Sequence, residues 1–324
     1  MIFLFTHKID WRPLMPRSPQ KLRMPHPVDF DARSLLFIPA DAERFIARGA
    51  ERGADVVILD LEDGVAPASK AAARAALPAA VKTLRQGGAT VYVRVNNEPP
   101  LLAGDIAAVV ASGADGIVMP KVEAPEQLTQ LDAQVLRQEQ QSGRAANALR
   151  FIVLIETPLG VCRALEIARA SPRLVGLCFG SEDFSTAMGI DPLVEAMTGP
   201  AQAVAIAAAA AGVQPLGLPG TVGDFSDPQA YRALAVTARR IGIRGAVCIH
   251  PAQVQVLNDV FGGTDAEAAA AERLVAAFDA GIAQGKGAIA LDGKMIDVPI
   301  ANRARLFLQR RQARLARKAG GAKP

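Results

Sequence analysis

The sequence is poor in cysteine, aromatic residues and histidine. It has 5% aromatic residues, three histidines and three cysteines without a Cys-x-x-Cys pair: Cys162, Cys178 and Cys248. An odd number of widely spaced cysteines favours neither a disulfide framework nor a cysteine zinc site, and it fits a reducing compartment. The apolar run at residues 1–5 is too short for a signal sequence or a membrane span. We therefore expect a cytoplasmic protein with no membrane partner.

The net charge of +4 is unevenly distributed along the chain. Residues 1–30 carry a net charge of +3, residues 298–324 carry +8 without a single acid, and residues 31–297 carry −7. A basic run can contact nucleic acid, but a solvated helix face is its more frequent meaning. We expect no nucleic-acid partner, and we interpret the proline-rich residues 1–30 as a loose N-terminal extension.

Eight short apolar runs alternate with longer stretches of helical period from Arg33 onward. The expected strands are 34–38, 55–60, 90–95, 116–119, 151–155, 174–179, 213–218 and 245–249. The expected helices include 42–51, 69–85, 124–140, 161–169, 193–211 and 228–240. This number of strands suits a (β/α)8 barrel, whereas a doubly wound sheet usually has fewer strands and a Gly-rich fingerprint, which is missing here after the first strand. The sequence predicts an α/β protein with a TIM barrel over residues 31–262.

Residues 263–324 depart from this alternation. An Ala/Glu-rich helix is expected over 265–284, followed by a Gly-rich turn, the segment 290–298 and a basic helix. These elements cannot be further barrel strands. We expect a C-terminal helical arm or lid that packs on the barrel or on a neighbouring subunit.

Acidic residues follow the fifth and sixth expected strands. In a TIM barrel the catalytic groups lie where strands end. Glu156 and Asp183 end adjacent strands, so their carboxylates can converge on one Mg²⁺, an ion usually held by one or two carboxylates and several waters. The alternative is that both acids cap the helices that follow them. The occurrence of the pair favours the metal.

Three residues at strand ends, Arg94, Lys121 and His250, each have two possible roles. Arg94 lies inside an otherwise apolar strand, where it can bind a substrate carboxylate with two hydrogen bonds or form a structural ion pair with Asp60 or Glu62. Lys121 resembles a Schiff-base lysine, but the paired acids favour a metal and leave Lys121 as an ion-pair partner. His250 either caps the eighth helix or contacts a ligand there.

Seven motifs in order resemble the HpcH/HpaI aldolase/citrate lyase beta-subunit family, and within it the lyases of citryl-, malyl- or citramalyl-CoA. The motifs are RSLLFIP (33–39), LDLED (59–63), VRVN (93–96), MPK (119–121), IET (155–157), FGSEDF (179–184) and IHP (249–251). Together they cover the whole predicted barrel. Seven motifs in the same order indicate this family much more specifically than any one of them alone.

The resemblance implies a set of site residues. It implies Mg²⁺ held by Glu156 and Asp183, Glu62 and Asp63 around the metal waters, and a substrate carboxylate bound by Arg94. It also implies coenzyme A contacts from residues of the first and last motifs: Arg33, Phe37, Ile249 and His250.

The C-terminal segment 293–299 resembles the lid of malyl-CoA-type lyases, in which an aspartate is delivered to a neighbouring subunit's active site. Asp297 matches that aspartate. The resemblance thus implies a homo-oligomer, which we expect to be a trimer or a hexamer. The alternative is that Asp297 only caps the helix beginning near Pro299.

The resemblance therefore implies a Mg²⁺-dependent carbon–carbon lyase that acts on CoA esters. A 3-hydroxy-3-carboxyacyl-CoA or a thioester of malyl-CoA type would be cleaved to acetyl-CoA and a 2-keto acid, or formed from them, with Glu62 or Asp63 as base and Asp297 as acid. Alternatives are a malyl-CoA-type thioesterase and a metal-dependent pyruvate aldolase that does not use CoA. A non-catalytic subunit is disfavoured by the complete set of acids and arginine.

Overall fold

The structure is a computed structural model that describes residues 30–320, so the predicted extension at 1–30 lies outside the described residues except for Phe30. Its centre is a sheet of eight parallel strands in the order β7-β6-β5-β4-β3-β2-β1-β8. The strands are β1 Ser34–Pro39, β2 Val56–Asp60, β3 Val91–Arg94, β4 Gly116–Met119, β5 Arg150–Ile155, β6 Leu174–Phe179, β7 Gln214–Gly217 and β8 Ala246–Cys248. Two backbone hydrogen bonds of 3.0 Å link the β7 region to the segment before β8, from Gly217 N–H to the Gly245 carbonyl and from Arg244 N–H to the Pro215 carbonyl. These bonds bring the two edges together, and the predicted TIM-barrel fold is confirmed.

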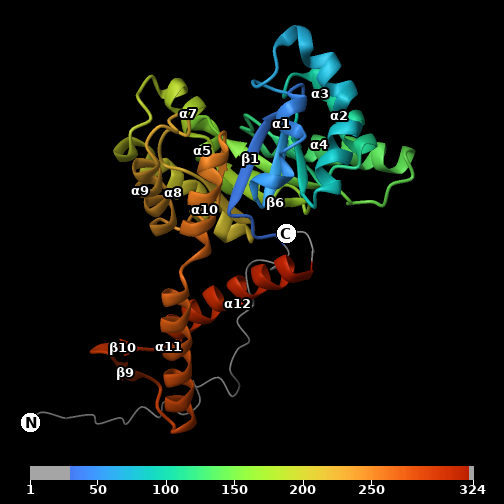
Figure 1. The fold of residues 1–324 in the computed structure, drawn as a ribbon. Coiled ribbons are helices and arrows are strands. Elements are labelled where there is room, and N and C mark those ends of the chain that lie inside the picture. Colours follow the sequence, from blue (N-terminus) through green and yellow to red (C-terminus); the bar gives the residue numbers. More distant parts are fainter. Residues whose placement is uncertain (1–29, 321–324) are drawn as a thin grey trace, which may run out of the picture.

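Helices surround the barrel (Figure 1). They are α1 Glu43–Ile46, α2 Lys70–Gln86, α3 Pro99–Ser112, α4 Pro125–Gln141, α5 Pro158–Cys162, α6 Ala164–Ala168, α7 Ser181–Met188, α8 Val194–Ala211, α9 Pro228–Arg240 and α10 Pro251–Gly262, with short 3₁₀ turns at Ala50–Arg52 and Pro67–Ser69. The helix predicted over 161–169 is instead divided into α5 and α6. The first begins earlier because the Thr157 hydroxyl accepts the Gly160 N–H and Pro158 occupies the first turn. Among residues 30–320, no helix is both long and apolar enough to cross a membrane.

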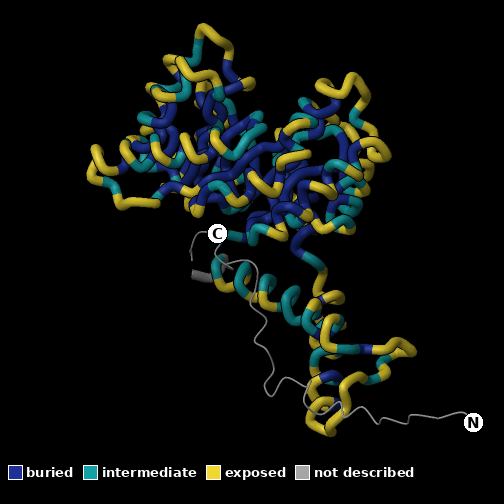
Figure 2. Tube along the Cα trace, turned by 180° about the vertical axis from the view of Figure 1, so that it is seen from behind, coloured by how far each residue is buried: buried dark blue, intermediate teal, exposed yellow. Residues whose placement is uncertain are grey.

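Side chains of the strands alternate between the barrel interior and the layer under the helices. Leu35 and Ile58 belong to the buried interior cluster, whereas their neighbours Leu36 and Leu59 pack in the larger outer cluster. This is the period of two expected of strands covered on both faces. Figure 2 shows that buried residues are concentrated in the barrel.

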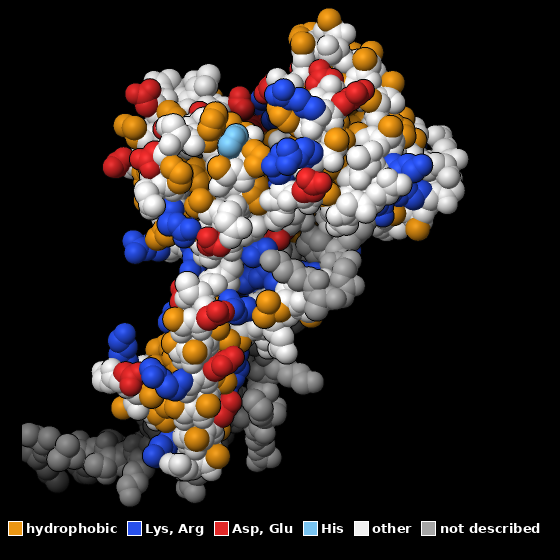
Figure 3. Space-filling view, in the orientation of Figure 1, with side chains coloured by type: hydrophobic (Ala, Val, Ile, Leu, Met, Phe, Trp, Pro, Cys, Tyr) orange, Lys and Arg blue, Asp and Glu red, His pale blue; other side chains and the backbone are white. Residues whose placement is uncertain are grey.

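The C-terminal arm consists of α11 (Asp265–Ala283), β9 (Ile289–Leu291), β10 (Lys294–Ile296) and α12 (Val298–Gly320). Its two strands form an antiparallel hairpin separate from the barrel sheet, and Phe278, Ile296 and Ala301 form a small core of its own. Figures 1 and 3 show the arm projecting from one end of the barrel, with hydrophobic side chains on its surface. That end is the amino-terminal end of the strands, because Arg314 of α12 pairs with Asp31, which precedes β1, at 2.7 Å.

The basic helix α12 differs from the freely solvated face that its charge predicts. Arg305 pairs with Asp279 and Arg311 with Asp265, both on α11. The arginines therefore hold α12 against the other arm helix and the base of the barrel.

Candidate active site

Asp60, Arg94 and Glu156 each lie two positions after an inward-facing apolar residue of their strand. Strand periodicity therefore directs all three toward the barrel axis at the carboxyl ends of β2, β3 and β5. They line one cavity of about 440 Å³. Its wall also includes Phe37, Asp63, Glu182, Asp183 and Ile249.

Arg94 is held in place by two acids and one ring. Its Nε and Nη2 groups donate to the two carboxylate oxygens of Asp60 at 2.7 and 2.6 Å. Its Nη1 lies 2.8 Å from Glu62 Oε2, and its guanidinium stacks 4.6 Å above the centre of the Phe37 ring. The predicted structural ion pair is thus present. A guanidinium has five N–H donors. Asp60 takes the Nε donor and one Nη2 donor, and Glu62 lies at Nη1, so one donor at Nη1 and one at Nη2 remain for another acceptor.

Lys121 contacts Glu62 and Asp63 in the loop after β2, and it also contacts Glu156, a candidate metal ligand. Its ammonium group lies 2.8 Å from Glu62 and 3.3 Å from Asp63, as predicted for an ion-pair partner, while its backbone N–H donates to Glu156 at 2.7 Å. The backbone of Lys121 is left-handed, with φ of 52°, a conformation that costs a non-glycine residue about 1 kcal/mol or more. Burial raises the pKa of Glu62 although Arg94 and Lys121 lower it in part.

Glu156 and Asp183 bring two carboxyl groups to the same cavity. Glu156 is 3% exposed; burial, and next the charge of Asp183, raise its pKa to about 8. Ionisation of both groups is therefore unfavourable without a counter-charge, and a bound cation would supply that charge. Among the described residues no three His, Cys, Asp or Glu side chains gather closely enough to hold a metal. Two carboxylates completed by water and substrate oxygens fit Mg²⁺, which retains several waters.

A glycine makes room for this pair. Gly180 lies between β6 and α7, and a Cβ atom there would come within 2.7 Å of Glu156 Oε2. Any side chain would displace the carboxylate, so the Phe-Gly-Ser-Glu-Asp motif needs its glycine for space. The same motif places Asp183 in the first turn of α7.

The residues expected to contact coenzyme A are divided between the two ends of the barrel. Phe37 and Ile249 line the cavity, and His250 lies beside it as the N-cap of α10, its Nδ1 accepting the Ala252 N–H at 3.2 Å. Arg33 precedes β1 and lies at the opposite end, where it pairs with Asp55 at 2.7 Å. The structure therefore does not bring Arg33 to this cavity, because a strand of six residues separates it from the carboxyl end of β1.

Asp297 also lies away from the cavity of its own chain. It precedes α12 in the arm, and its carboxylate accepts the Ile300 N–H at 3.2 Å, which is the capping contact predicted as the alternative. Within one chain the arm projects from the amino-terminal end of the barrel strands (Figure 1), whereas the residues that line the cavity lie at the carboxyl ends of the strands.

Comparison with known proteins places this site in a family. The sequence model of the HpcH/HpaI aldolase/citrate lyase family matches residues 33–251. The chain belongs to this family. The matched residues span all eight barrel strands and the strand-end residues described above, so the predicted resemblance is confirmed.

Several known proteins are similar to this chain over most of their length. Citrate lyase subunit beta of Escherichia coli is 31% identical over 86% of this chain and 92% of its own. The L-malyl-CoA/beta-methylmalyl-CoA lyase of Cereibacter sphaeroides is 33% identical over 86% and 93%. The crystal structure of protein CitE from Mycobacterium tuberculosis with magnesium, acetoacetate and coenzyme A matches 87% of this chain and 98% of that one, with 30% identity and a TM-score of 0.70.

One contributor to this family site was not predicted from the sequence. The Lys70 ammonium donates to the Leu61 and Glu62 carbonyls at 3.0 and 2.9 Å and to the Asn96 side chain. It thereby fixes the loop that carries Glu62 and Asp63. Its signal in the sequence is weak: a cation in the first turn of a helix, where the helix dipole disfavours positive charge.

Proposed function

We propose that this protein is a Mg²⁺-dependent lyase that breaks or forms a carbon–carbon bond next to a coenzyme A thioester. The observation that carries the proposal is the convergence of Glu156 and Asp183 with Arg94 in one cavity. Relatives named as citrate lyase beta subunit and malyl-CoA lyase, and a similar structure with magnesium, acetoacetate and coenzyme A, support it.

The residues present would hold the reacting groups as follows. Glu156 and Asp183 would hold Mg²⁺, which when bound supplies a positive charge for the oxygens that become negative during cleavage. Arg94, oriented by Asp60, would bind the carboxylate of the keto acid. Phe37, Ile249 and His250 would contact coenzyme A at the rim of the cavity.

Proton transfer would rest on the acids of the β2 loop and on the arm. Glu62 or Asp63 would take the hydroxyl proton of the substrate through a water molecule. Burial favours Glu62, because it raises the pKa of that carboxyl and so makes its carboxylate a stronger base. Asp297 of a neighbouring subunit would exchange a proton with the thioester carbon in a homo-oligomer, a trimer or a hexamer, acting in the cytoplasm.

The test is a product assay with malyl-, methylmalyl-, citramalyl- and citryl-CoA in the presence of Mg²⁺. We expect at least one thioester to give a shorter acyl-CoA and a 2-keto acid in equal amounts. Free coenzyme A with an intact hydroxy acid would support the thioesterase instead. Cleavage of 4-hydroxy-2-keto acids alone, with no CoA ester consumed, would support the pyruvate aldolase.

Arg94→Lys tests the carboxylate contact. Lysine keeps the charge but loses the planar fork, so we expect KM for the substrate to rise about 10- to 100-fold, the equivalent of one charge-assisted hydrogen-bonded pair. Initial rates and thermal melts are measured on the same preparation. An unchanged KM with a large fall in Tm would mean that Arg94 serves only Asp60 and Glu62.

A further inference from the structure

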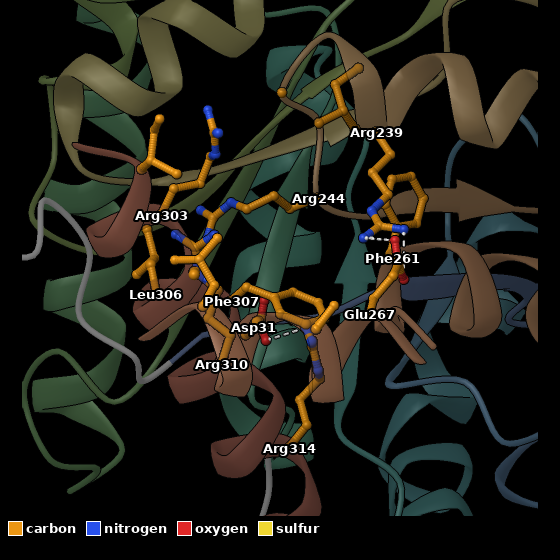
Figure 4. Close-up of a pocket in the computed structure, with 17 residues that line it drawn as sticks. Asp31, Arg239, Arg244, Phe261, Glu267, Arg303, Leu306, Phe307, Arg310 and Arg314 are labelled. Atoms are coloured by element: carbon orange, nitrogen blue, oxygen red, sulfur yellow. Dashed lines mark hydrogen bonds and ion pairs between the residues drawn. The ribbon is translucent and has the colours of Figure 1, made fainter. Parts of the chain in front are cut away.

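A second cavity lies between the barrel and the arm (Figure 4). It is at the end of the barrel opposite the candidate active site, because Asp31 and Arg244 in its wall precede β1 and β8. Its volume is about 540 Å³. Five arginines from α9, the segment before β8 and α12 line it, with two acids: Arg239, Arg244, Arg303, Arg310, Arg314, Asp31 and Glu267. Cations therefore outnumber acids on the wall of this cavity.

Both acids pair with arginines other than Arg244 and Arg310, although Oδ1 of Asp31 has no hydrogen-bond partner among the described residues. Glu267 pairs with Arg239 at 2.9 Å, and Asp31 pairs with Arg314 at 2.7 Å, as the dashed lines of Figure 4 mark. In the described part of the chain no acid forms an ion pair with Arg244 or Arg310. The buried Nη2 of Arg244 has no hydrogen-bond partner there.

This arrangement is costly without a counter-charge. Burial, and next the charge of Arg310, lower the pKa of Arg244 to about 9, and burial also lowers the pKa of Arg310. The charge of Asp31 offsets only part of each shift. Arg244 and Arg310 are half-buried, and taking a charge partly out of water without an ion-pair partner is destabilising.

We propose that this cavity binds a small polyvalent anion bearing phosphate or carboxylate groups, through Arg244 of the barrel and Arg310 of α12. The planar fork of arginine suits both groups, each of which can accept two parallel hydrogen bonds. The bound anion would join the arm to the barrel, because its two arginines come from different parts. The site is independent of the proposed function, since it shares no lining residue with the candidate active site.

Thermal melts of the full chain with EDTA, at constant ionic strength, test the proposal with pyrophosphate as the phosphate probe and citrate as the carboxylate probe. We expect saturating pyrophosphate or citrate to raise the Tm of the unmodified protein by at least about 3 °C. The probe that acts at the lower concentration identifies the preferred group. Glu156→Gln should keep this response, which separates the site from the carboxyl end of the barrel.

Arg244→Gln should have two effects that a structural arginine would not show. Without anion its Tm should equal or exceed that of the unmodified protein, because a half-buried charge without an ion-pair partner is removed, and the rise with anion should disappear. Arg310→Gln should lose the same response and serves if Arg244→Gln does not fold. Arg137→Gln is the matched control, since Arg137 is exposed on α4 and does not line the cavity.

Two results would overturn the proposal. One is an equal anion response in the unmodified protein and in both the Arg244 and Arg310 variants, which would reflect general salting effects. The other is a fall in Tm with Arg244→Gln together with a lower sedimentation coefficient and no anion response, which would place an acidic segment of a second copy in the cavity.

Discussion

Replacing Glu156 by Gln, or Asp183 by Asn, is expected to lower kcat/KM for Mg²⁺-supported thioester cleavage by on the order of 10³-fold, the equivalent of several kcal/mol of transition-state stabilisation. Each change removes one charged oxygen and keeps the side-chain volume. Both residues line the same cavity as Arg94. The measurement is the initial rate with the thioester that the product assay identifies, over a range of Mg²⁺ concentrations.

The stability of these variants separates loss of metal from loss of fold. In the metal-free protein, burial and the charge of Asp183 oppose ionisation of Glu156, so Glu156→Gln should not lower the Tm. Mg²⁺ should raise the Tm of the unmodified protein but not that of either variant. Glu123→Gln is the matched control, because Glu123 also follows a barrel strand but does not line the cavity. Near-native turnover of Glu156→Gln in the presence of EDTA would contradict the metal assignment.

The barrel was predictable because its strands are short, apolar and buried on both faces. The bounds expected for β4 and β6 agree with those observed, since each is a compact apolar run between polar or glycine-containing segments. Helices were harder to predict. The helix α3 was not predicted at all, because it opens with Pro99 and Pro100, which are typical of loops but also favour a first helical turn.

The composition of the candidate site was predictable, but its internal contacts were not. Strand periodicity explains why Asp60, Arg94 and Glu156 point to one axis, and all three occur in recognisable motifs. The bidentate bond from Arg94 to Asp60 depends on the register of β2 against β3, which pairs these two residues. The sequence of either strand alone does not determine that register. Likewise, the position of Arg33 at the far end of β1 follows from strand direction, which a motif match does not convey.

The location of Asp297 makes a prediction about the assembly. Its carboxylate lies in the arm, at the end of the barrel opposite the cavity of its own chain. Met295 and Val298 beside it are 65% and 49% exposed. Exposed apolar residues around a single acid are typical of a surface that another subunit covers. We therefore expect the arm of one chain to complete the active site of another in a closed oligomer.

Asp297→Asn is expected to abolish turnover while preserving the fold, because Asn is as good an N-cap as Asp but cannot transfer the proton. Mixing this variant with Glu156→Gln under subunit exchange should restore activity in the sites that combine the intact barrel of one chain with the intact arm of the other. Random exchange of equal amounts gives about one quarter of such sites in a ring in which each arm serves a neighbour. Native mass spectrometry reports whether mixed oligomers form, and the rate of thioester cleavage reports complementation. Mixed oligomers without activity would exclude a shared site. Full activity of Asp297→Asn alone would mean that Asp297 only caps α12, through its 3.2 Å contact with the Ile300 N–H.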